Sequence, residues 1–260
     1  MKVLICRSHD AAIARAADVI AAHIRQHSAP VLGLATGGTM LPLYDRLAVL
    51  HRDAGLSFAR CSSFNLDEYV GIAPEHPASY HTYMREALFD HVDIDLARTY
   101  LPRGDATDVQ AEAGAYEARI ASAGGISLQL LGIGQNGHIG FNEPTSSLGS
   151  RTRIKTLTES TRTANRQYFG PGETAPQYAL TMGIGTILDA RECLLLATGQ
   201  AKSAAVAAMI EGPVSAVCPA SALQLHARAT VILDQAAAAE LKLTDYYHQV
   251  HPNGEATRFD

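Results

Sequence analysis

Residues 3–35 read VLICRSHDAAIARAADVIAAHIRQHSAPVLGLA, and the expected architecture can be built outward from them. Two short apolar runs, VLIC at 3–6 and VLGLA at 31–35, flank an alanine-rich segment from about 10 to 26 whose apolar residues recur at helical spacing. A helix between two apolar strands returns the chain to the start of a neighbouring parallel strand. The stretch therefore predicts a β-α-β unit.

The same alternation continues along the rest of the chain. The further elements expected are strands in 61–69 (passing into a loop), 126–134, 193–199 and 229–234, and helices in 40–51 and 79–92. Strands separated by helices predict a mostly parallel sheet of at least six strands, covered by helices on both faces. Because no loop is long enough to be a linker, we expect one α/β domain over 1–260, with the polar end at 248–260 frayed.

The composition excludes several classes of protein. Apolar residues make up 47% of the 260 residues and charged residues 18%, which is typical of a packed globule and not of a disordered chain. The formal net charge is -5 and Trp is absent, so we expect no nucleic-acid partner. The N-terminal apolar run is shorter than that of a signal peptide, and no segment has about 18 uninterrupted apolar residues. We therefore expect a chain that is neither secreted nor membrane-spanning.

The cysteines and histidines show no metal-binding pattern. The four cysteines lie far apart and form no Cys-x-x-Cys pair, so we expect reduced core residues of a cytoplasmic protein. They are Cys6, Cys61, Cys193 and Cys218. Among the histidines, His76 and His81 are five residues apart and form no His-Glu-x-x-His motif. No metal site is predicted.

Polar motifs follow several of the expected strands, where ligands bind in open α/β sheets. In ATGGT, residues 35–39, Gly37 and Gly38 let backbone N–H groups converge at the start of a helix, which suits a phosphate. A plain tight turn with a Thr N-cap is an equally weighted alternative. In FNLDEY, Asp67 and Glu68 follow a strand, where a carboxylate can act as a base on a bound ligand or simply cap a helix or turn.

LGIGQNGHIGFNEP, residues 131–144, is the densest polar motif of the chain. Its glycines satisfy Gly-x-Gly-x-x-Gly, but a dinucleotide fingerprint also needs a helix and an acidic residue about 20 positions later. The chain has Pro144 and Leu157 instead, so the sequence argues against a nicotinamide site. The motif presents His138 with Glu143 five residues on, and this spacing lets the carboxylate orient the imidazole.

Two basic features complete the set of candidates. In SRTRIKT, the alternation places Arg151, Arg153 and Lys155 on one side of an extended segment, where they form either an anion site or a solvated face. Lys202 follows the apolar run CLLLA within TGQAK.

These motifs, in their order along the chain, resemble the glucosamine-6-phosphate deaminase family from about residue 31 to 243. The segments that carry the resemblance are LATGGT, FNLDEYVG, EHPASY, LLGIGQNGHIGFNEP, SSLGSRTRIKTLT, LTMGIGTIL and ALQLH. The related 6-phosphogluconolactonases share a Gly-x-Gly-x-x-Gly-His loop, but theirs does not continue into FNEP. A lactone hydrolase and a non-catalytic sugar-phosphate sensor remain the alternative hypotheses.

The resemblance implies a Rossmann-like fold and conversion of glucosamine 6-phosphate and water to fructose 6-phosphate and ammonia, without a metal or organic cofactor. It implies that Asp67 moves a proton between C2 and C1, and that His138, oriented by Glu143, assists ring opening at O5. The residues implied to hold the 6-phosphate are Thr36, Gly37, Gly38, Thr39 and Lys202.

The chain departs from the family pattern at two positions. Asn136 stands where many members have Asp, and because an amide cannot take a proton, we expect it to orient its neighbours. Gln167 stands where members commonly have Arg, and Arg166 precedes it, so one phosphate contact is expected to be weakened or shifted.

The resemblance extends to the allosteric branch of the family, in which SRTRIKT forms an effector site at a subunit interface. The matching residues are Ser146, Arg153, Lys155 and Thr156, with Tyr247 as a looser counterpart. This implies a homo-hexamer activated by N-acetylglucosamine 6-phosphate.

Overall fold

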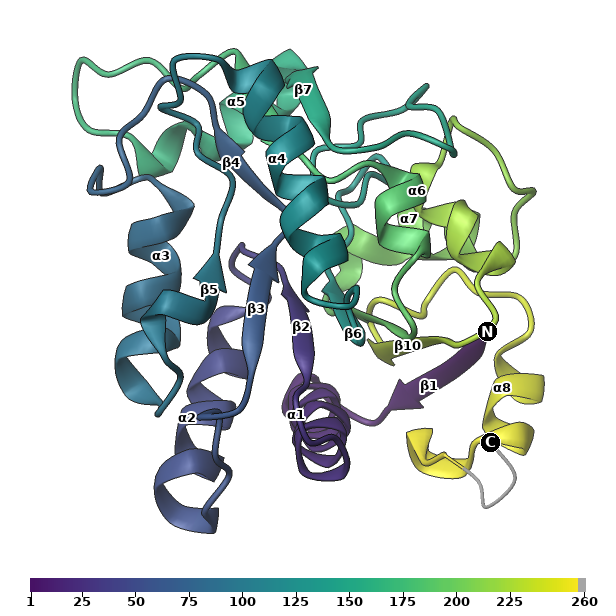
Figure 1. The fold of residues 1–260 in the computed structure, drawn as a ribbon. Helices are drawn as coiled ribbons and strands as arrows, with labels where there is room; N and C mark the ends of the chain where they lie inside the picture. Colours follow the sequence, from purple (N-terminus) through teal and green to yellow (C-terminus); the bar gives the residue numbers. More distant parts are fainter. Residues whose placement is uncertain (257–260) are drawn as a thin grey trace.

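The computed structural model describes residues 1–256 and contains a seven-stranded sheet in the order β1-β10-β9-β6-β2-β3-β5 (Figure 1). Its strands are β1 (Lys2–Cys6), β10 (Ala229–Asp234), β9 (Cys193–Ala197), β6 (Leu128–Leu131), β2 (Val31–Leu34), β3 (Ser62–Asn65) and β5 (Thr99–Tyr100). All neighbouring strands are parallel. The predicted single α/β domain with a mostly parallel sheet is confirmed.

Helices connect the strands and flank the sheet (Figure 1). They are α1 (His9–Gln26), α2 (Leu41–Ala54), α3 (Tyr80–Ala87), α4 (Val109–Ser122), α5 (Glu159–Asn165), α6 (Ile184–Leu188), α7 (Ser203–Ile210) and α8 (Thr244–Val250). Helix α1 begins at His9, where the Ser8 hydroxyl accepts from the Ala11 N–H at 3.1 Å and caps the helix. Its buried stripe includes Ile13, Ile20 and Ile24, so α1 packs on the sheet through the predicted apolar residues.

A second sheet was not expected. Strands β4 (Asp67–Tyr69), β8 (Tyr178–Thr181) and β7 (Arg153–Thr156) form an antiparallel sheet in the order β4-β8-β7. The sequence pattern predicts a loop at residues 67–69, because three residues are too few to show a two-residue period. Only pairing with β8, more than a hundred positions later in the chain, makes them a strand.

The core and the chain end follow from burial. All four cysteines are free and buried, as predicted. The sequence predicts a frayed end at 248–260. In the structure, α8 continues to Val250, the side chain of His251 is buried, and Gly254 packs beside Ile5 of β1. Residues 257–260 lie outside the described residues. Within residues 1–256, no helix is long and apolar enough to cross a membrane.

The loop that follows β5 lies directly on β4. The Gly71 N–H donates to the Gly104 carbonyl at 2.9 Å, and a Cβ atom on Gly104 would lie only 1.8 Å from the carbonyl oxygen of Tyr69. No side chain fits in this space. The absence of a side chain at position 104 therefore permits the contact that supports β4 from outside the sheets.

We predict that Gly104→Ala lowers the free energy of unfolding by about 1–3 kcal/mol, because the added methyl group overlaps backbone atoms. Gly114→Ala is the matched control, because Gly114 lies exposed in α4 with open space around it. This variant should have a free energy of unfolding about 0.5–1 kcal/mol higher than that of the wild type. Urea unfolding measures both changes. Equal stability of the two variants would contradict the close packing at position 104.

Candidate active site

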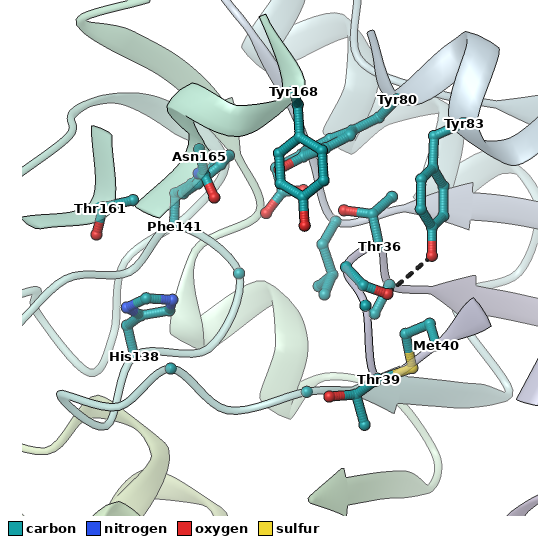
Figure 2. A pocket seen from close by; sticks show the side chains of 18 of the residues that line it. Thr36, Thr39, Met40, Tyr80, Tyr83, His138, Phe141, Thr161, Asn165 and Tyr168 are labelled. Atoms are coloured by element: carbon teal, nitrogen blue, oxygen red, sulfur yellow. Dashed lines mark hydrogen bonds between the residues drawn. The ribbon is translucent and has the colours of Figure 1, made fainter. Parts of the chain in front are cut away.

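A cavity of about 630 Å³ opens beyond the carboxyl ends of β9, β6, β2 and β3, four neighbouring strands of the main sheet. Each strand leads into one predicted motif, so residues far apart in sequence line the same space (Figure 2). The predicted residues among them are Thr36, Gly37, Gly38, Thr39, Asp67, Asn136, His138 and Lys202. Glu143 lies behind this lining, in contact with Asn136.

The loop after β2 forms a tight turn held from two sides. The Met40 N–H donates to the Gly37 carbonyl at 2.9 Å, and the Tyr83 hydroxyl donates to the same oxygen at 2.9 Å (Figure 2). Helix α2 begins at Leu41, its N-cap is Met40, and no side chain caps it. The hydroxyl of Thr39 is therefore not used as an N-cap, and both threonines of the loop line the cavity.

Lys202 follows β9 and lines the same cavity as the turn after β2. Strand β6 lies between β9 and β2 in the sheet. The ammonium of Lys202 donates to the Ile133 carbonyl at 2.7 Å, and burial lowers its pKa. The loop that carries it is anchored by Asp234, whose carboxylate oxygens accept from the Gly199 N–H at 3.0 and 3.1 Å. A cation and a glycine-rich turn thus face one cavity, an arrangement suited to an anionic group.

Asp67 is the buried acid of the cavity. Its side chain is 6% exposed and faces the loop at Gly140. Burial, together with the neighbouring charge of Glu68, raises the pKa of Asp67 to about 8, although the Phe141 N–H lowers it in part. A carboxyl with this pKa can take up and return a proton near neutral pH.

Glu68 performs the other role that the Asp-Glu pair allowed. Its Oε2 accepts from the Tyr80 N–H at 2.9 Å and lies 2.9 Å from Nδ1 of His81. It therefore meets the first turn of α3 instead of the cavity. The alternation of side chains along β4 separates the two carboxyls, so one is available to a ligand while the other fixes a helix.

His138, Asn136 and Glu143 form a connected chain of hydrogen bonds. Asn136 Oδ1 lies 2.6 Å from His138 Nδ1, and Asn136 Nδ2 donates to Glu143 Oε2 at 2.7 Å. The direct separation of His138 Nδ1 and Glu143 Oε2 is 3.6 Å. The shortest contact of the imidazole is thus to Asn136, and Glu143 reaches the ring mainly through the amide.

Glu143 remains ionised despite its burial. Burial raises the pKa of Glu143, but contacts from His138, Thr161 and Asn136 outweigh this effect and bring it to about 2. Thr161 of α5 donates to Oε1 at 2.5 Å. The carboxylate therefore places a fixed negative charge at one end of the chain that leads to His138.

Gly134 of this loop makes room for the ring of His138. A Cβ atom on Gly134 would lie 2.2 Å from Cε1 of His138, so the ring can occupy its position only above a glycine. This packing accounts for one glycine of the Gly-x-Gly-x-x-Gly pattern without a dinucleotide.

Aromatic residues of the cavity were missed by sequence reasoning. Tyr80 and Tyr83 come from α3 and Tyr168 from the segment after α5, and Phe141 completes this wall (Figure 2). The spacing around Tyr80 and Tyr83 predicts a helix, and Tyr80 ends the segment EHPASY, but neither pattern shows which face of the helix meets the cavity. Gln167 also lines the cavity, whereas Arg166 is not among the lining residues.

The residues matched to an effector site lie outside the cavity lining: Arg153, Lys155 and Thr156 belong to β7, Ser146 precedes this strand, and Tyr247 lies in α8. Arg153 donates to Asn142 Oδ1 at 2.9 Å, so it touches the loop that carries His138. The hydroxyl oxygen of Ser146 is buried and has no hydrogen-bond partner among residues 1–256. Lys155 is half-buried and Thr156 is exposed.

Arg151 does not join Arg153 and Lys155 on one side, contrary to the expected alternation. It precedes β7, and its guanidinium pairs with Glu117 at 2.6 Å and with Asp189 at 2.5 Å. These two carboxylates draw the side chain away from the strand. Within the described part of the chain, no group of three or more His, Cys, Asp or Glu residues could hold a metal ion.

Comparison with known proteins places this fold and cavity in a family. Residues 7–232 match the sequence model described as glucosamine-6-phosphate isomerases/6-phosphogluconolactonase. The chain therefore belongs to that family of sugar-phosphate proteins.

Two curated relatives with high sequence identity bear the same name. A glucosamine-6-phosphate deaminase of a Marinomonas species is 57% identical over 251 residues, covering 95% of this chain and 94% of the relative. The deaminase of that name from Cellvibrio japonicus is 50% identical, covering 96% of this chain and 95% of its own.

Solved structures agree with the fold. A monomeric glucosamine-6-phosphate deaminase is 46% identical and superposes with a TM-score of 0.90, covering 92% of this chain and all of its own. A 6-phosphogluconolactonase from Trypanosoma cruzi shares the fold, with a TM-score of 0.74, 22% identity, and coverage of 93% of this chain and 97% of its own.

We predict that Asp67→Asn stabilises the folded protein increasingly from about pH 4 to pH 8. The pKa of Asp67 rises from its usual 3.8 to about 8 on folding, so ionising it opposes folding as pH rises through this window. The stability difference between variant and wild type should grow by roughly 1.4 kcal/mol per pH unit and level off above pH 8. Urea unfolding at several pH values measures it, and a difference independent of pH would contradict the assigned burial.

Proposed function

We propose that this protein is a glucosamine-6-phosphate deaminase that converts glucosamine 6-phosphate and water to fructose 6-phosphate and ammonia. The observation that carries the proposal is the buried carboxyl of Asp67 in the same cavity as His138 and the turn at Thr36–Thr39. Relatives of that name at 50% identity and above support the choice of substrate.

The phosphate of the sugar occupies one end of the cavity. The N–H groups of the turn after β2 and the ammonium of Lys202 receive it, because both face the cavity and neither is neutralised by a carboxylate contact there. Holding the phosphate fixes the distance from C6 to the reacting carbons. The sugar ring then extends toward His138 and Asp67.

His138 opens the ring. When its Nδ1–H donates to Asn136 Oδ1, Nε2 is left to exchange a proton with the ring oxygen O5 and with the hydroxyl at C1. Asn136 keeps the ring oriented and transmits the negative charge of Glu143, but as an amide it does not itself exchange a proton.

Asp67 carries out the isomerisation of the open-chain amino aldehyde. The C2–H bond breaks as the Asp67 carboxylate takes the proton, and the electron pair forms the C1–C2 double bond. The π pair of the C1 carbonyl moves to O1, which takes a proton from solvent, so that an enol amine results. Asp67 then returns its proton to C1 while the nitrogen lone pair forms the C2–N double bond of an iminium. Water adds to this iminium and the nitrogen departs as ammonium, so that fructose 6-phosphate is formed with no change in overall oxidation state.

The proposal is tested by measuring ammonia and fructose 6-phosphate with purified protein in the presence of a chelator. We expect both products in equal amounts, and we expect Asp67→Asn to lower kcat by about 100- to 10,000-fold while substrate still binds. Asp53→Asn, an exposed carboxylate on α2, is the control and should leave kcat unchanged.

Other outcomes identify the alternatives. Hydrolysis of 6-phosphogluconolactone without deamination would assign a lactonase. Binding of amino-sugar phosphates without turnover of either substrate would assign a sensor. Unchanged turnover in Asp67→Asn would remove Asp67 as the base.

We also propose that Ser146, Arg153, Lys155 and Thr156 bind N-acetylglucosamine 6-phosphate as an activator within a homo-hexamer. Three features support an effector role: β7 is an edge strand, the Ser146 hydroxyl lacks a partner among the described residues, and Arg153 contacts the catalytic loop through Asn142. The solved relative at 46% identity is monomeric, so assembly is a property to be measured for this chain directly.

We expect N-acetylglucosamine 6-phosphate to lower the substrate concentration needed for half-maximal rate, and Lys155→Ala to abolish this shift by removing a cation of the effector site. Arg46→Ala, an exposed cation on α2, should retain the shift. Sedimentation of the wild type should give a hexamer. A monomer whose substrate curve ignores the acetylated sugar would overturn both parts of the proposal.

A further inference from the structure

A second carboxylate and a histidine lie behind the proposed base, outside the lining of the cavity. The carboxylate of Glu68 is buried at 1% exposure, and its Oε1 accepts from the Tyr69 N–H at 2.8 Å. Its Oε2 accepts from the N–H groups of Tyr80 and His81 at 2.9 and 3.3 Å and lies 2.9 Å from the imidazole Nδ1 of His81. His81 is thus the side-chain partner of a carboxylate that sits next to Asp67 in sequence.

The adjacency of Asp67 and Glu68 has an electrostatic consequence. After burial, the charge of Glu68 is the next cause that holds the pKa of Asp67 high, because two neighbouring carboxylates resist ionising together. A positive charge on His81 acts in the opposite sense, since it neutralises Glu68 at close range. Histidine is the side chain whose charge ordinarily changes between about pH 5 and 8.

We propose that Glu68 and His81 are positioning residues for Asp67: the imidazolium of His81 balances the charge of Glu68 and thereby governs whether Asp67 carries a proton. The pair touches neither the cavity nor the substrate. This inference rests on the proposed function, because it concerns the proton that Asp67 moves.

Among the described residues around the pair, His81 is the basic side chain in contact with Glu68. On β4 and α3 the neighbours are Asp67 and the phenols of Tyr69 and Tyr80. From the loop after β5, Gly104 packs on the Glu68 side chain, and Asp105 faces His81 but is held by Arg103 at 2.8 Å. From α4, Tyr116 faces Asp67. The Arg103 charge is therefore paired with Asp105, and the imidazole of His81 is the basic group that contacts Glu68.

Two substitutions separate this role from simple support of α3, because they shift the same quantity in opposite directions. The acidic limb of the pH profile of kcat/KM reports the ionisation of Asp67 in the free enzyme. Glu68→Gln removes a negative neighbour and should move this limb to lower pH by about 1 unit. His81→Asn keeps a donor toward Glu68 but cannot be charged, so the limb should move to higher pH by about 0.5 unit. His9→Asn, whose imidazole pairs with Asp10 at the exposed start of α1, is the control and should not move it.

Opposite shifts support the proposal; no shift, or shifts of the same sign with lower kcat, overturn it, since a misplaced helix would affect both variants alike. Turnover by the wild type is measured first and tests the proposed function on its own. If the wild type is inactive, the stability difference made by adding Asp67→Asn to each background, followed with pH by urea unfolding, reports the ionisation of Asp67 without turnover. That pH step should move down in Glu68→Gln and up in His81→Asn, and an unmoved step overturns the inference.

Discussion

The burial of one carboxyl group, that of Asp67, is the constraint on which the site depends. Asp67 stands where the chain leaves β3 of the parallel sheet and enters β4 of the antiparallel sheet, paired with Thr181 of β8. An ionised carboxylate removed from water without a cation is costly, so the group is held in its protonated form to higher pH. The same environment that opposes folding gives the group a proton affinity suited to carbon acid chemistry.

Several features of the fold keep this group in place. Glu68 fixes the first turn of α3, which supplies Tyr80 and Tyr83 to the cavity wall. The loop at Gly104 closes on β4 from outside, at a distance that excludes any side chain. The burial of Asp67 thus lowers the stability of the fold, and the packing around it raises that stability, a common relation between stability and activity.

Most of the parallel sheet could be predicted from the sequence, because β1, β2, β6, β9 and β10 are mainly apolar runs and several of its helices are amphipathic. The motifs after β2, β3, β6 and β9 could be placed at one edge of the sheet, because the carboxyl ends of parallel strands lie at the same edge. These motifs do meet in one cavity. The antiparallel sheet could not be predicted, because β4 is defined only by pairing with the distant β8. The sequence could not show that His138 lies closer to Asn136 than to Glu143, because spacing along the chain does not give the distances between side chains.

The most direct test is the titration of the Asp67 carboxyl in the free protein, followed by NMR of protein labelled with ¹³C at the aspartate carboxyl carbons. Asp67→Asn identifies the signal by its disappearance. We predict a midpoint near pH 8, because the group is buried beside Glu68. A midpoint near the usual value of 3.8 would mean that Asp67 is solvated and unperturbed, and it would contradict the role assigned to this residue.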